Sequence, residues 1–278
     1  MRPLLKSLLL STMQVTNASF FQSALRYIGY GASLGWHERN AGNISVLLTD
    51  DEVGQVSDSF NQSNFTDMSV PVPTLGGRYI FTTVSGSYFL DISFDAETKF
   101  CICEINGSGT AYRVVWGGNK PTSEFCGHLL SLSELNERGG GRAVYHCHPS
   151  NVIALTFLLP QTDADITSAL WRSLTECAFV FPEGVGIVPF YVPGSLELAK
   201  ATAEKVKTYN AVIWSHHGVF ATGIDIESAF GLAHAIEKAA EIRCKILSCG
   251  HPDSEISDEE LIRSAKHYGY ILNTDLLK

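Results

Sequence analysis

The segment VYHCHPSN, residues 144–151, lies near the middle of the chain and reads as the end of a strand followed by a helix. Side chains alternate between the two faces of a strand, so His146 and His148 point one way and Cys147 points the other way. Two strand steps separate the histidine Cα atoms by about 6.6 Å, which lets both imidazoles bind one metal ion. The pattern also fits two hydrogen-bonded polar side chains at a strand end, and the spacing leaves both interpretations open.

The segments on either side of this strand predict one α/β domain. Strands are expected over 44–49, 79–83, 88–92, 100–105, 112–116, 143–147, 178–181, 187–190, 211–215 and 219–222. Helices are expected over 20–36, 123–137, 149–158, 193–209 and 225–247, and from 257 onward. Residues 50–77 read as a long polar surface excursion. Short turns between the strands favour antiparallel neighbours, so we expect a largely antiparallel sheet with helices on its faces.

Composition narrows the possible partners. The 278 residues are 45% hydrophobic and carry a net charge of −9, which argues against nucleic acid as a partner because a duplex-binding protein normally has a basic excess. No apolar run reaches the roughly 20 residues that a membrane span needs, so no membrane partner is expected. Seven cysteines without a CxxC pair are typical of reduced thiols, and we expect a cytoplasmic protein.

The first twelve residues, MRPLLKSLLLST, differ from the rest of the chain. Two basic residues before a short leucine run resemble an export signal faintly, but the apolar run is short and no clear cleavage site follows. We interpret residues 1–12 as an N-terminal extension of doubtful status and 13–278 as a single domain.

A second pair of histidines, His216-His217, follows the apolar strand AVIW and precedes Gly218. A third imidazole would complete a three-histidine site, which leaves one position of a tetrahedral zinc open for substrate. The spacing does not choose between the two histidines, and both also fit a solvent-facing turn.

Other polar segments suggest an anion site. Thr122 and Ser123 stand at a predicted helix start, where hydroxyls and free amides bind phosphate, although an ordinary helix cap has the same sequence. Glu124 would act as a base only if it faces the metal. The loops 40–43 and 83–87 offer small residues and amides to oxyanions, and each alone also fits a simple turn.

Together these pieces resemble the class II aldolase and adducin-head family. The matching segments are GWHERNAGN at 35–43, TVSGS at 83–87, PTSE at 121–124, HCH at 146–148, LWRSLTEC at 170–177, FPEGVGIVP at 181–189, VPG at 192–194 and HHGVF at 216–220. They occur in the family's order over nearly the whole chain from about Met13. Each motif is weak alone, but the combination is highly specific.

The resemblance implies a three-layer αβα sandwich with a central, mainly antiparallel sheet, a homotetramer and one Zn²⁺ per subunit. It implies that His146, His148 and His217 bind the metal, because the family's ligand is the histidine directly before Gly-Val, and that Glu124 is the acid/base residue. It also implies a set of residues around the substrate phosphate: Asn40, Gly42, Asn43, Ser85, Thr122 and Ser123. Glu176 matches an acid that reaches a neighbouring subunit's site. Val84 departs from the family pattern, because it replaces a usual glycine in the second loop.

The implied activity is a zinc-dependent aldolase reaction. The expected substrate is the phosphorylated ketose L-rhamnulose 1-phosphate, cleaved reversibly through an enediolate to dihydroxyacetone phosphate and L-lactaldehyde. Alternatives are a related fuculose-phosphate aldolase, a sugar-phosphate 4-epimerase and a non-catalytic adducin-like scaffold, although a scaffold should lack the metal histidines. Without the resemblance, the histidines alone would suggest a metallohydrolase.

Overall fold

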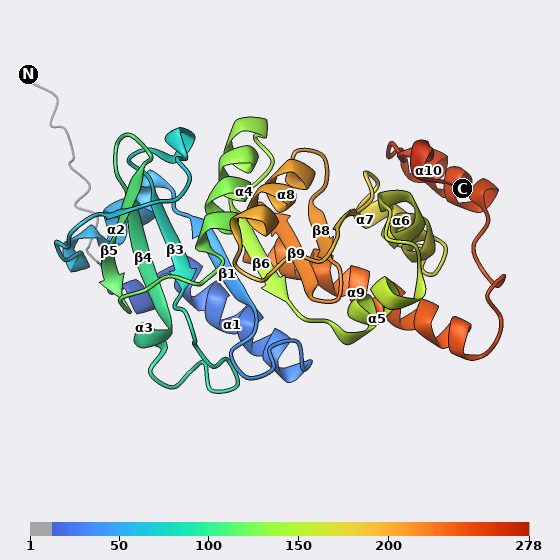
Figure 1. Cartoon of the computed structure of the whole chain (residues 1–278), viewed down its shortest axis with the longest axis horizontal. Helices are drawn as coiled ribbons and strands as arrows, with labels where there is room; N and C mark the ends of the chain where they lie inside the picture. Colours follow the sequence, from blue (N-terminus) through green and yellow to red (C-terminus); the bar gives the residue numbers. More distant parts are fainter. Residues whose placement is uncertain (1–12, 278) are drawn as a thin grey trace, which may run out of the picture.

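In the computed structural model, which describes residues 13–277, nine strands form one sheet (Figure 1). The strands run in the order β2-β5-β4-β3-β1-β6-β9-β8-β7, and all neighbours are antiparallel except β7 and β8. Their bounds are β1 Asn43–Leu47, β2 Thr66–Asp67, β3 Tyr79–Thr83, β4 Phe100–Ile105, β5 Ala111–Gly117, β6 Ala143–Cys147, β7 Gly186–Val188, β8 Ala211–Trp214 and β9 Gly218–Gly223. The predicted extension at 1–12 lies outside the described residues.

Helices cover both faces of this sheet. Figure 1 shows α4 and α8 along one face and α1 and α9 along the other, while α6, α7 and α10 gather at the β7 end. The α-helices are α1 Ser19–Ser33, α2 Asp50–Val56, α3 Ala96–Lys99, α4 Phe125–Arg138, α5 Ser150–Leu158, α6 Asp163–Trp171, α7 Cys177–Val180, α8 Leu196–Val206, α9 Ile226–Ser248 and α10 Asp258–Tyr268. The predicted three-layer arrangement with a mainly antiparallel sheet is confirmed. Within residues 13–277, no helix has both the length and the apolar character to cross a membrane.

Strand β6 separates two hydrophobic cores. Tyr145 and Cys147 belong to the core that α1 and α9 cover, whereas Val144 belongs to the core that α4 and α8 cover. This alternation follows from the two-residue period of a strand, and it turns His146 to the α4 side. Its ring lies 4.4 Å from the ring of Trp214 on β8, which belongs to the same core as Val144. The sheet therefore directs the HCH motif as the sequence predicts.

Two predicted strands are wrong. Residues 88–92 form an irregular segment in which Phe89 and Ile92 are buried, so their apolar character reflects packing onto the core and not pairing in the sheet. Residues 178–181 overlap the short helix α7, where the Val180 amide donates to the Glu176 carbonyl. A four-residue apolar run does not distinguish a strand from a buried helical turn.

The chain reverses its direction after Trp214, so residues 218–223 do not continue β8. Residues 215–217 form a turn, and β9 returns antiparallel to β8, with Trp214 paired to Gly218. Residues 50–77 contain α2, whose Thr49 and Glu52 form a reciprocal capping box. Helix α6 was not predicted from the sequence.

Candidate metal centre and active site

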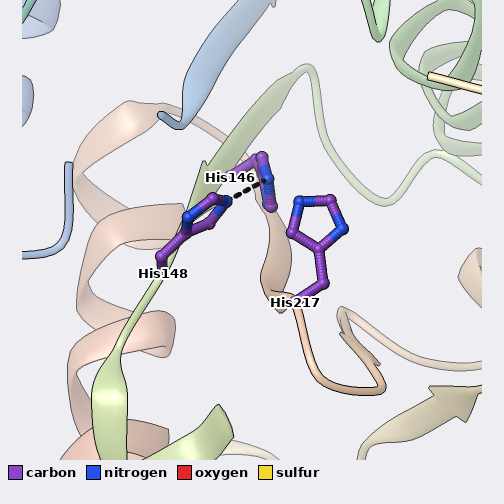
Figure 2. Close-up of side chains that lie close together, drawn as sticks. All are labelled: His146, His148 and His217. Carbon is purple, nitrogen blue, oxygen red and sulfur yellow. Dashed lines mark hydrogen bonds between the residues drawn. The ribbon is translucent and has the colours of Figure 1, made fainter. Parts of the chain in front are cut away.

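Three imidazoles converge where β6 ends (Figure 2). The Nε2 atoms of His146 and His148 lie 3.3 Å apart, and one ring nitrogen from each of these residues and His217 lies within 4.8 Å of the others. Tetrahedral zinc with Zn–N bonds of about 2.0–2.1 Å brings its ligand nitrogens to about 3.4 Å from one another. The spacing and the all-imidazole donor set therefore fit one transition-metal ion.

A backbone carbonyl of the neighbouring strand β9 fixes the ring of His146. Its Nδ1 lies 2.9 Å from the carbonyl oxygen of Val219 on β9, so Nδ1 carries the proton and donates it to that carbonyl. Nε2 is left with a free lone pair that points into the cluster. A backbone acceptor behind a ligand imidazole fixes both its tautomer and its ring orientation.

His148 has a carboxylate behind it instead of a carbonyl. Its Nδ1 lies 2.6 Å from Oε1 of Glu38, and its backbone amide donates to the carbonyl of Trp36 at 2.9 Å. Both partners come from the loop between α1 and β1. Glu38 therefore orients His148 with Nε2 facing the cluster.

His216 and His217 separate at the β8–β9 turn. His216 has φ of 62°, and its ring contacts the Thr156 hydroxyl at 3.1 Å and lies 3.9 Å from the ring of Phe157. The His217 ring lies 4.9 Å from the rings of both His148 and Trp214. The structure brings His217 to the cluster and turns His216 away from it.

Glu124 stands beside the imidazoles at the start of α4. Its Oε2 lies 3.6 Å from Nε2 of His146, and its Oε1 lies 4.0 Å from Nε2 of His217. Asn43 Nδ2 donates to Oε2 at 2.8 Å. Burial raises the pKa of Glu124, although the hydrogen bond from Asn43 and the charge of His148 oppose that rise. A raised pKa brings a carboxyl group closer to the range in which it exchanges protons at neutral pH.

Two of the histidines are neutral at physiological pH. Burial lowers the pKa of His146 well below its ordinary value and lowers the pKa of His217 to about 4. Their short distances to Glu124 are therefore contacts between a carboxyl group and neutral rings, not ion pairs. Neutral imidazole is the form that binds metal ions.

The first loop predicted to bind phosphate packs closely on β6. Gly42 has φ of 78°, and a Cβ atom at this position would lie only 2.8 Å from the carbonyl oxygen of His146. The same Cβ atom would also collide with the buried ring of His37, which bonds through Nε2 to the Tyr145 hydroxyl at 2.7 Å. Asn43 follows at the first position of β1, paired with His146, while Asn40 is exposed.

The second loop is joined to the start of α4. The Thr122 amide donates to the carbonyl of Thr83 at 2.8 Å, and the Ser85 amide donates to the carbonyl of Lys120 at 3.1 Å. These bonds bring Ser85 beside the Thr122-Ser123 segment; Thr122 is buried and Ser123 is exposed. Val84 forms a bridge with Pro121, and the positive φ of this loop falls on Gly86. A valine at 84 is therefore compatible with the backbone of the loop.

Glu176 lies away from this group of residues in the fold. It is exposed at the start of α7, which packs on α6, α9 and α10. Among residues 13–277, no hydrogen bond or ion pair joins Glu176 to the histidines or to Glu124. The geometry of one chain brings together the other predicted metal and acid/base residues but not this one.

Residues 30–244 match the family described as Class II Aldolase and Adducin N-terminal domain. This range covers most of the chain and contains the three histidines and Glu124. The chain belongs to this family.

Two relatives that this class II aldolase matches over most of their length carry the same name. The chain is 39% identical over 241 residues to a rhamnulose-1-phosphate aldolase of Pectobacterium atrosepticum, covering 84% of this chain and 88% of that protein. It is 36% identical over 261 residues to a rhamnulose-1-phosphate aldolase of an Enterobacter strain, covering 92% and 95%.

Solved structures agree on the fold. A sugar-phosphate aldolase from Thermotoga maritima matches with a TM-score of 0.72 and 31% identity, covering 82% of this chain and 95% of that one. An L-fuculose 1-phosphate aldolase matches with a TM-score of 0.61 and 22% identity, covering 91% and 98%. The second match, at this low identity, supports the class II aldolase fold alone.

The residues that hold the histidine rings in place were not predicted from the sequence. Glu38 lies inside the GWHERNAGN motif, but its partner His148 is 110 residues away. His37, beside it, connects the Gly42 loop to β6. A conspicuous acid in a class II aldolase motif is the one signal that could have drawn attention to Glu38.

Proposed function

We propose that this chain is a zinc-dependent aldolase that reversibly cleaves L-rhamnulose 1-phosphate into dihydroxyacetone phosphate and L-lactaldehyde. Curated relatives with the corresponding name align over 84–92% of the chain. The observation that carries the chemistry is the buried Glu124 carboxyl, 3.6 Å from the Nε2 atom of His146 in a three-histidine cluster. That arrangement combines a metal site with an acid/base group.

The proposed role of the metal site is to stabilise the negative charge that bond cleavage creates. Breaking the C3–C4 bond of the ketose leaves negative charge on the three-carbon fragment, shared with its ketone oxygen. A Zn²⁺ ion, held by His146, His148 and His217, supplies Lewis-acid stabilisation of that charge when it is bound. Because imidazole binds metal ions in its neutral form, three histidine ligands would leave the positive charge of such an ion undiminished. This chemistry requires no lysine Schiff base.

Glu124 is the proposed proton carrier. As the C3–C4 bond breaks, the C4 hydroxyl passes its proton to the Glu124 carboxylate and becomes the aldehyde carbonyl, and the electron pair of the broken bond remains on the three-carbon fragment. Glu124 delivers a proton to C3 of that fragment, which completes dihydroxyacetone phosphate, and removes the same proton in synthesis. Asn43 fixes the carboxyl by donating to Oε2 at 2.8 Å.

The phosphate is proposed to bind without a basic patch. Backbone amides and small polar side chains of two loops and a helix start supply the hydrogen bonds, and this remote binding energy positions the reacting carbons. The proposed residues are Asn40, Gly42, Asn43, Ser85, Thr122 and Ser123.

The assembly and its setting are also proposed. The domain 13–278 acts as a cytoplasmic homotetramer with one Zn²⁺ per subunit, and Glu176 reaches the site of a neighbouring copy. Its exposure at the start of α7 suits that role. Light scattering gives the subunit number, and Glu176→Ala should lower activity without releasing zinc.

One assay tests the reaction and its substrate together. The zinc-loaded protein is incubated with L-rhamnulose 1-phosphate or L-fuculose 1-phosphate, and dihydroxyacetone phosphate is measured by its enzymatic reduction with NADH. We expect release from the first substrate at a kcat/KM at least tenfold higher, abolished by a chelator and restored by zinc. A preference for the fucose-derived substrate would overturn the substrate assignment, and release that resists the chelator would overturn the metal-dependent mechanism.

A further inference from the structure

Helix α5 begins directly after the HCH motif and has no cap of its own. Its N-cap residue is Pro149, which makes no side-chain capping hydrogen bond. The first amides of a helix have no partners within the helix, so they need acceptors from elsewhere. In this protein the acceptors come from a distant helix.

Glu237 on α9 supplies these acceptors. Its Oε1 accepts from the backbone amide and the side-chain Nδ2 of Asn151, at 3.2 and 2.8 Å, and its Oε2 accepts from the Val152 amide at 3.0 Å. Figure 1 shows α5 against α9, and Glu237 is only 9% exposed. A buried carboxylate at a helix N-terminus forms strong, charge-assisted hydrogen bonds.

The two histidines of the HCH motif differ in what holds their backbone. His146 is paired on both sides within the sheet, with Asn43 of β1 and Phe220 of β9. His148 lies beyond the last paired residue of β6, Cys147. Its position therefore depends on its contacts with the 35–43 loop and on the place where α5 begins.

Only Pro149 and Ser150 stand between His148 and the amides that Glu237 holds. Proline has a fixed φ, so this short connection transmits a displacement of the α5 start to His148 with little loss. Glu237 thereby fixes the backbone of His148 from its C-terminal side, whereas Glu38 fixes the orientation of the His148 ring.

We propose that Glu237 is a positioning residue for the metal site, which sets the backbone of His148 by capping α5. This inference rests on the proposed function, in which His148 is a metal ligand. Glu237 touches neither the metal nor the substrate in this proposal, and its effect is on how firmly and in what geometry the ion is held.

The test compares Glu237→Gln with two controls on α9. Glutamine keeps the shape but turns an NH₂ group toward amide donors and removes the charge. Glu241→Gln removes a carboxylate one turn later, where it is half-buried and pairs with Lys238 and Lys245. Lys238→Gly weakens the same helix at an exposed position. The readouts are the rate at which the protein loses Co²⁺ to a chelator and the visible absorption of the cobalt-loaded protein.

We expect Glu237→Gln to lose cobalt about tenfold faster, with a changed visible spectrum, since loss of a supporting interaction typically weakens metal binding by about 10–100-fold. Asn151→Ala, which removes one of the three hydrogen bonds, should give a smaller change in the same direction. Glu241→Gln should stay within about twofold of the wild type. Wild-type release and spectrum in Glu237→Gln would overturn the proposal, as would equally fast release from Lys238→Gly. Equal cobalt retention by wild type and His148→Ala would instead overturn the proposed metal site itself.

Discussion

Oε2 of Glu124 and Nε2 of His146 lie 3.6 Å apart, and both side chains are buried. Burial raises the pKa of the carboxyl and lowers the pKa of the imidazole, so both groups are driven toward their neutral forms. The imidazole is thereby kept as a metal ligand, and the carboxyl is brought toward a working acid/base. These two neighbouring side chains thus provide the metal ligand and the acid/base group that the proposed aldolase requires.

Replacing the carboxyl should separate these two functions. Glu124→Gln keeps the shape and an acceptor near Asn43 but cannot carry a proton, so we expect kcat to fall by about 10²–10⁴-fold. Zinc content, measured by elemental analysis, should stay at the wild-type level. Turnover within a factor of three of the wild type would show that another group moves the proton.

The adjacent residues His216 and His217 in the β8–β9 turn offer a matched pair of variants. His217→Ala removes a ring from the cluster, so zinc and activity should be lost together. His216→Ala removes the neighbouring ring, which contacts Thr156 and Phe157, and should retain both. Zinc retained in His217→Ala but lost in His216→Ala would reverse the ligand assignment.

His148→Ala should resemble His217→Ala, because it removes the ring that approaches Nε2 of His146 at 3.3 Å. Elemental analysis after dialysis, together with the cleavage assay, measures both effects. Unchanged zinc content would remove His148 from the ligand set.

The sequence predicted the parts of this site that depend on local periodicity. Strand β6 matches its predicted bounds, because a strand at the centre of a sheet is apolar on both faces except where it carries function. The choice between His216 and His217 could not be predicted from spacing, because both lie in a turn whose backbone direction depends on the left-handed conformation of His216.

Glu38 and Glu237 could not be predicted for a different reason. Their partners lie 110 and about 86 residues away, and no local pattern encodes such a pairing. The false strand at 88–92 has the same origin, since a loop that folds over the core is as apolar as a strand.

Two glycines of the GWHERNAGN motif should respond differently to alanine. Both have positive φ, 77° at Gly35 and 78° at Gly42, so each substitution strains the backbone by about 1 kcal/mol. A Cβ atom at 35 meets open space, whereas one at 42 collides with His37 and the His146 carbonyl. We expect Gly42→Ala to cost about 3 kcal/mol in total, because overpacking adds to the strain. Urea unfolding measures both variants, and equal losses would contradict the close packing of this loop on β6.

The buried His128 should make stability depend on pH. Burial lowers its pKa from 6.5 to about 3, and its Nδ1 bonds the Ser45 hydroxyl at 2.8 Å. Between pH 6.5 and pH 3 this histidine is therefore protonated in the unfolded chain but not in the folded chain. Its contribution to the free energy of unfolding is complete above pH 6.5 and is lost as the pH falls toward 3. By pH 5 the loss is about 2 kcal/mol, at 1.36 kcal/mol for each pKa unit.

His128→Asn removes this titration while keeping a donor toward Ser45. Its free energy of unfolding should fall less between pH 7 and pH 5 than that of the wild type, whatever its absolute stability. The exposed His251 supplies the control, because His251→Asn should leave the pH dependence unchanged. An unchanged slope in His128→Asn would mean that the folded protein accepts a proton at His128.

A zinc titration of the metal-free protein, with L-rhamnulose 1-phosphate as substrate, tests the proposed zinc-dependent cleavage most sharply. The initial rate of dihydroxyacetone phosphate release is measured at increasing zinc per chain. We predict that the rate rises linearly from near zero and reaches a plateau at one zinc per chain, and that Glu124→Gln binds the same amount of zinc without that rise. Undiminished release before any zinc is added, or no release at any zinc level, would rule out the proposed zinc-dependent cleavage of this substrate.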